Sequence, residues 1–140
     1  MKVRTHMIAM SFLVFGGLGQ SRQTSVGAAP LQHELESPDW IANEEDNICG
    51  ISDLKKVTNP AKVSYDKLLD ATPQIQELKH KGIDPDSTEG KALRKGAKTL
   101  ITKTCELVRA AKGHCSVWRV ISHKDGRSIP DLTDEVIEKF

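Results

Sequence analysis

The chain reads KALRKGAKTLITKTCELVRAAK over residues 91–112, and this stretch carries its strongest helical pattern. At about 100° of rotation per residue, its apolar side chains fall on one face of a helix. That face is formed by Leu93, Ala97, Leu100, Thr104, Leu107, Val108 and Ala111. Ser87 or Asp86 is suited to cap the start of this helix, and Gly113 to end it. The spacing predicts a long amphipathic helix that buries one side.

A helical segment interrupted by proline precedes the long helix. Apolar residues between positions 64 and 81 recur at helical spacing, but Thr72-Pro73 lies among them. Proline lacks a backbone donor and disfavours helix in the residue before it. The sequence therefore predicts two short helices, at about 65–71 and 73–81, with Gly82 ending the second. We expect both to pack against the long helix.

The C-terminal region combines strand and helix signals. Residues 115–122 are rich in β-branched and aromatic side chains, and Asp125-Gly126 is a turn signal before Ser128-Ile129. This pattern predicts a small C-terminal β-hairpin. A last short helix follows, capped by Asp131 or Thr133. The predicted fold class is α+β, mainly α-helical.

The first 28 residues have the three-part order of a secretory signal peptide. Lys2 and Arg4 precede an apolar run of about 13 residues, whereas a membrane-spanning helix needs about 20. Val26 and Ala28 supply the small side chains that signal cleavage requires. We expect a mature chain that starts at Ala29, has no membrane span, and is secreted or periplasmic.

Charge divides the mature chain into an acidic front and a basic body. Residues 29–54 carry seven acids and no Lys or Arg, whereas residues 55–140 carry 17 basic and 12 acidic residues. Residues 29–59 have few large apolar side chains, and we interpret them as an acidic arm or linker. Within this arm, Ser37-Pro38-Asp39 favours a short helix that would carry Trp40. Residues 60–140 then form one small helical domain.

Three cysteines in an exported chain predict one disulfide and one leftover thiol. Cys49 lies in the acidic arm, and its expected partner is either Cys105 on the long helix or Cys115 just after it. A bridge from Cys49 to Cys105 closes a loop of about 56 residues, worth roughly 4 kcal/mol on the chain-entropy model. The third thiol either packs in the core or links two chains, so we expect a monomer or a disulfide-linked dimer.

A basic stripe runs along the long helix, away from its apolar face. It consists of Lys91, Arg94, Lys95, Lys98, Arg109 and Lys112. Such a stripe is either a solvated face, neutralised in part by the acidic arm, or a binding site for anions. The candidate partners are anionic lipid headgroups, acidic polysaccharide and acidic protein. Nucleic acid is not expected, because no aromatic residues are interleaved with the cations.

Catalytic chemistry is an alternative interpretation of the C-terminal region. His114, His123 and Asp125 supply the residue types of a small secreted hydrolase, provided that they meet in a cleft. The cysteines and histidines in residues 105–123 lack the paired spacing of zinc ligands, so we expect no metal and no cofactor.

The leading functional hypothesis is an exported accessory or binding protein that acts through the basic stripe. The alternatives are the hydrolase and a disulfide-linked structural protein of the cell envelope.

Overall fold

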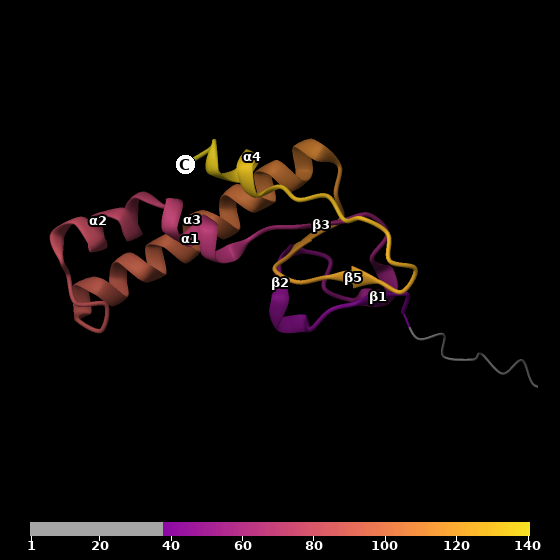
Figure 1. Cartoon of the computed structure of the whole chain (residues 1–140), viewed down its shortest axis with the longest axis horizontal. Helices are drawn as coiled ribbons and strands as arrows, with labels where there is room; N and C mark the ends of the chain where they lie inside the picture. Colours follow the sequence, from indigo (N-terminus) through magenta and orange to yellow (C-terminus); the bar gives the residue numbers. More distant parts are fainter. Residues whose placement is uncertain (1–37) are drawn as a thin grey trace, which may run out of the picture. The chain divides into compact units, whose positions relative to one another are not determined.

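A computed structural model describes residues 38–140 of the chain. The predicted signal peptide, its cleavage site and the first part of the acidic arm lie outside these residues. The architecture is α+β with a large helical share, as the sequence predicts. Figure 1 shows a long helix, α3, with shorter helices beside it and short strands near one end.

The long helix α3 spans Thr88–Lys112, so it begins three residues before the predicted stretch. The Ser87 hydroxyl accepts a hydrogen bond from the Gly90 amide at 3.0 Å, and Gly113 ends the helix in the left-handed conformation. The buried face is rotated from the one predicted. Leu107 is 70% exposed, whereas Ile101 and Cys105 are fully buried.

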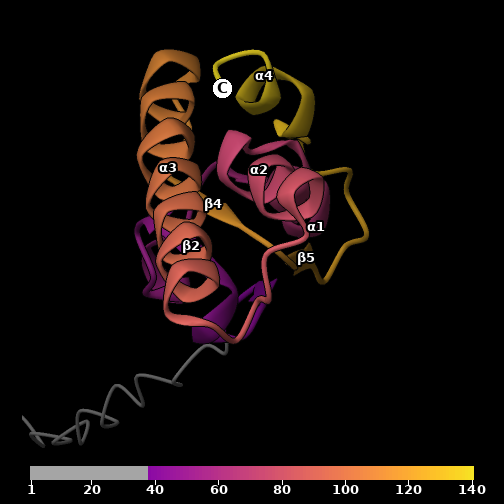
Figure 2. The same cartoon turned by 90° about the vertical axis from the view of Figure 1, so that its left-hand side faces the viewer.

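Helices α1 (Tyr65–Ala71) and α2 (Pro73–Lys81) confirm the predicted break at Thr72-Pro73. The buried Thr72 hydroxyl donates to the Leu69 carbonyl at 2.7 Å and accepts from the Ile75 amide at 3.4 Å, so one side chain bonds to both helices. Both helices pack against α3, and α4 (Thr133–Ile137) packs against its C-terminal half (Figure 2). The predicted association of α3 with the proline-broken segment is confirmed.

The strands form two small sheets. In the first, β4 (Ser116–Trp118) lies between β2 (Asn47–Gly50), which is antiparallel to it, and β3 (Pro60–Lys62), which is parallel. In the second, β1 (Trp40–Ile41) pairs with β5 (Ser122–His123).

The predicted C-terminal hairpin is wrong, because β4 and β5 each pair with strands from before α1. All three residues of β4 are buried, and both edges of this strand already have partners. The short helix expected around Trp40 is also wrong, because this residue lies in β1, opposite His123. Short 3₁₀ turns at Glu44–Asp46 and Leu54–Lys56 connect the strands of this region.

The core consists of two clusters that β4 joins. Val117 belongs to the first, with residues from α1, α3 and α4, and Trp118 belongs to the second, with Trp40 and Val57. Residues 38–59 of the expected acidic arm thus contribute two strands and buried side chains to the folded domain. The Trp118 indole N–H donates to the Ser116 hydroxyl at 2.7 Å, which satisfies a polar group inside the core.

Gly50 sets how closely β2 approaches β4. Its φ is +83°, and a Cβ atom there would lie 2.4 Å from the Cys115 carbonyl oxygen and 2.7 Å from the Ser116 Cα. Only glycine allows both this conformation and this approach of two backbones.

We predict that Gly50→Ala lowers the free energy of unfolding by about 3 kcal/mol, since the new methyl group meets backbone that cannot yield. Gly82→Ala is the matched control, because Gly82 also has a positive φ of 61° but has no atom within 4 Å of the added Cβ position. It should lose only about 1 kcal/mol. Urea denaturation measures the free energy of unfolding of both variants. An equal decrease in the two would contradict the close approach of backbones at Gly50.

Candidate functional site

The N-terminal half of α3 carries four cations on one surface. We call Lys91, Arg94, Lys95 and Lys98 the basic cluster. Their spacing of three and four residues aligns them along the helix, and all four are exposed. Together they line a shallow hollow of about 250 Å³.

The other two members of the predicted stripe are bound to acids on the protein itself. Arg109 forms an ion pair with Glu106 and donates to the His114 carbonyl at 2.8 Å. Lys112 forms an ion pair with Glu135 at 3.1 Å. The predicted stripe therefore divides into a structural part near the end of α3 and the basic cluster near its start.

Within residues 38–140, no member of the basic cluster forms an ion pair. The acids of residues 38–59 therefore do not neutralise it by direct contact. Like charges at helical spacings of four residues repel, as Lys91 and Lys95 do, and the positive end of the helix dipole adds to the potential at Lys91. A bound anion would reduce this unfavourable positive potential.

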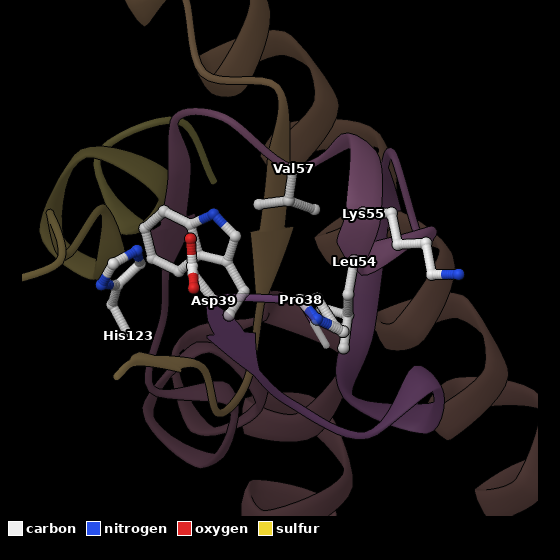
Figure 3. Close-up of a pocket in the computed structure, with 7 residues that line it drawn as sticks. Pro38, Asp39, Leu54, Lys55, Val57 and His123 are labelled. Carbon is white, nitrogen blue, oxygen red and sulfur yellow. The ribbon is translucent and has the colours of Figure 1, made fainter. Parts of the chain in front are cut away.

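A second hollow lies beside β1 and β5 and has a volume of about 610 Å³ (Figure 3). Its lining comprises Pro38, Asp39, Trp40, Leu54, Lys55, Val57 and His123. The His123 ring meets the Trp40 ring edge to face, with centroids 4.5 Å apart. Figure 3 shows His123 on one side of the hollow and Lys55 on the other, with Asp39 between them.

His123 and Asp125, two residues of the predicted hydrolase set, are in contact. The His123 Nδ1 atom lies 2.7 Å from an Asp125 carboxylate oxygen. Hydrogen bonds from the Arg127 side chain and backbone hold the pKa of Asp125 well below its usual range. Asp125 therefore stays ionised and can orient the imidazole.

His114, the third residue of that set, lies elsewhere. It follows the end of α3, and its Nδ1 atom is 3.3 Å from the Asn59 carbonyl oxygen. His114 is not among the residues that line the hollow beside His123. In the structure, His123 and Asp125 are therefore in contact, and His114 does not line the same hollow.

The three cysteines are free thiols in two different environments. Burial raises the pKa of Cys49 and that of Cys105 to about 12. Burial also tends to raise the pKa of Cys115, but hydrogen bonds from Ser116, Thr58 and Asn59 outweigh it and lower the pKa. Cys115 is therefore the cysteine that most readily forms a thiolate.

Residues 38–140 contain no group of three His, Cys, Asp or Glu side chains placed to hold a metal ion. None of the helices within this range is both long enough and apolar enough to cross a membrane.

Comparison with known proteins gives no relative: no family model, no curated protein and no solved structure matches the chain. The function of this protein is therefore inferred from its own surface and charges.

The hollow beside His123 was not predicted from the sequence. Its walls come from residues 38–57 and from β5, which meet only because β1 pairs with β5. No local pattern encodes that pairing of two-residue strands. The isolated Trp40, in a segment with few apolar side chains, was the one available signal of a buried contact.

We predict that iodoacetamide at about pH 8 alkylates Cys115 at least tenfold faster than Cys49 or Cys105, because only the thiolate reacts. The lowered pKa of Cys115 means that its rate rises and levels off at lower pH than that of an ordinary cysteine. The other two thiols stay protonated until the pH approaches about 12. Peptide mass spectrometry after timed alkylation measures each rate, and similar rates at all three sites would contradict the assignment.

Proposed function

We propose that this chain is an exported accessory or binding protein that contacts an anionic surface through the basic cluster. The observation that carries the proposal is the gathering of four exposed cations around one hollow of α3, with no ion pair to the described acids. Arg109 and Lys112 near the end of the same helix, by contrast, do pair with acids.

Several weak attractions acting together give such a surface its affinity. A single exposed ion pair contributes about 0–1 kcal/mol, and salt screens it over about 8 Å at physiological ionic strength. Near an anionic membrane, however, each Lys or Arg adds about 1 kcal/mol. Four cations on one helix face therefore favour a partner that presents several anionic groups side by side, rather than one small ion.

Phosphate, sulfate and carboxylate groups fit this description. Anionic lipid headgroups, acidic polysaccharides and acidic proteins all present them in arrays. Single-stranded nucleic acid is a poorer match, because the hollow has no aromatic side chain among its four lining residues on which a base would stack.

Export supports a partner outside the cytoplasm. The proposed location, secreted or periplasmic, rests on the basic start, short apolar run and small residues of positions 1–28. Cell-envelope lipids and polysaccharides are the anionic surfaces that such a protein meets.

We predict that the exported protein begins at Ala29. Cleavage after Ala28 leaves small residues at the two positions that signal peptidase reads, whereas cleavage after Ala29 would place Pro30 directly behind the cut. Intact mass spectrometry of protein recovered from outside the cytoplasm measures the start. Recovery of the full-length chain would contradict export by cleavage.

We predict that replacing Lys91, Lys95 and Lys98 together by Glu weakens binding to anionic vesicles by about a hundredfold or more. Each lost cation removes about 1 kcal/mol, and about 1.4 kcal/mol corresponds to a factor of ten. The fold should survive, because all three side chains are exposed and none forms an ion pair within residues 38–140 that the substitution would break. Vesicle co-sedimentation at low salt measures binding, and circular dichroism checks the helix.

The matched control replaces Lys56, Lys67 and Lys139 by Glu. These lysines are also exposed, lie outside α3, and change the net charge by the same amount. Binding should fall far less in this variant. Equal loss in both variants would show that only the overall charge matters, and the proposed site would be abandoned.

The choice of probe distinguishes the sources of the anionic groups. Vesicles of phosphatidylcholine alone, vesicles that also contain phosphatidylglycerol, and immobilised heparin separate headgroups from polysaccharide. Binding to none of the anionic probes at low salt would contradict contact with an anionic surface of either kind.

A hydrolase remains the second candidate, because His123 and Asp125 are paired at the edge of a hollow of about 610 Å³. An imidazole held by an ionised carboxylate is suited to activate water as a general base. In this hydrolase hypothesis His123 and Asp125 act without His114, which does not line the hollow.

A further inference from the structure

Strand β2 packs against the C-terminal half of α3. Cys49 in β2 contacts the core cluster that contains Cys105. A Cβ atom at Gly50 would lie 3.1 Å from the Arg109 side chain, one turn further along α3. Two neighbouring residues of β2, Cys49 and Gly50, therefore lie close to α3, the first near Cys105 and the second near Arg109.

The register of the sheet turns Cys49 toward Cys105. Cys49 lies opposite Val117 in the antiparallel pair of β2 and β4, and residues opposite each other project from the same face of a sheet. Val117 and Cys105 are both fully buried in the first core cluster, and Cys49 packs against that cluster. The two thiols thus border the same layer of the core, between β2 and α3.

Cys115 belongs to a different environment. Its Sγ atom accepts a hydrogen bond from the Asn59 amide at 3.4 Å, and the residue packs against the second cluster, with Trp118. Cys49 packs against the first cluster instead. The Cys115 backbone adjoins β2, since its carbonyl accepts from the Ile51 amide at 3.1 Å, but its side chain packs against a different cluster from that of Cys49. This difference distinguishes the two candidate partners of Cys49, which the sequence alone leaves open.

We propose that Cys49 and Cys105 form a disulfide that ties β2 to α3, and that Cys115 is the leftover thiol. All three sulfurs are reduced in the structure and no two lie at disulfide distance, so Cys49 and Cys105 must move closer together for the bond to form. The proposal is independent of the proposed anion binding, because it involves neither the basic cluster nor its partner.

The oxidant is a second disulfide, such as oxidised glutathione or an oxidised thiol–disulfide oxidoreductase. The partly exposed Cys49 attacks as its thiolate, forms a mixed disulfide and releases one reduced thiol. The buried Cys105 then attacks the Cys49 sulfur, closes the intramolecular bond and releases the second thiol. Two protein thiols lose two electrons and two protons, and the oxidant gains them.

Folding determines when this exchange is fast. In the folded chain burial raises the pKa of both thiols to about 12, so few thiolates are present near neutral pH. In the unfolded chain both cysteines are accessible to the oxidant. The bond is therefore expected to form as the chain folds, and far more slowly once it is folded and reduced.

The test refolds the reduced, denatured full chain in a mixture of oxidised and reduced glutathione, then alkylates the remaining thiols. We expect a protein lighter by two hydrogen atoms, with one alkylated thiol at Cys115, and a proteolytic peptide that links Cys49 to Cys105. Oxidation should raise the urea concentration at the unfolding midpoint, because the bond closes a long loop in the unfolded chain.

Three variants separate the outcomes. Cys115→Ser should still form the linked peptide, whereas Cys49→Ser and Cys105→Ala should each lose it and also lose the shift in midpoint. Circular dichroism verifies that each variant has folded before its thiols are scored. A peptide linking Cys49 to Cys115, or three alkylated thiols in the refolded wild-type chain, would overturn the proposal.

Discussion

The fold depends on the complete burial of β4, the three residues Ser116–Trp118. A buried strand must have partners for its backbone groups on both edges, because unpaired N–H and C=O groups inside a protein are costly. β2 and β3 supply these partners, although they come from before α1 and β4 follows α3. Val117 and Trp118 then point into separate clusters, so one short strand organises both halves of the core.

This constraint also determines which part of α3 is available for binding. The C-terminal half of α3 is held by β2 and α4, where Arg109 and Lys112 pair with Glu106 and Glu135. The N-terminal half packs on α2 through its small and apolar side, as at Gly96, where Gln74 is the nearest neighbour. Its opposite side keeps the basic cluster exposed. The same helix thus uses cations near its end for structure and leaves those near its start available to an anion.

The sequence predicted the features that depend on local rules. Helical spacing, Thr72-Pro73 and Gly113 indicated the three main helices within a few residues of their ends. The strands could not be predicted in this way, because β1 and β5 have two residues each and their pairing joins distant segments. The buried face of α3 was misjudged at Leu107 because β2 packs near Cys105 and shifts the buried side. Likewise, the cations of the predicted stripe were visible in the sequence. The ion pair of Arg109 with Glu106 is local to α3, but that of Lys112 depended on where Glu135 lies.

We propose that the start of α3 is the surface that meets an anionic partner. The most direct measurement is a two-dimensional NMR titration of the isotope-labelled protein with a short heparin fragment or with bicelles that contain an anionic lipid. We expect amide shifts concentrated around the basic cluster, at residues 88–99, that disappear when salt is added. Shifts centred on His123 and Trp40 instead, or spread evenly over the exposed lysines of residues 38–140, would contradict it.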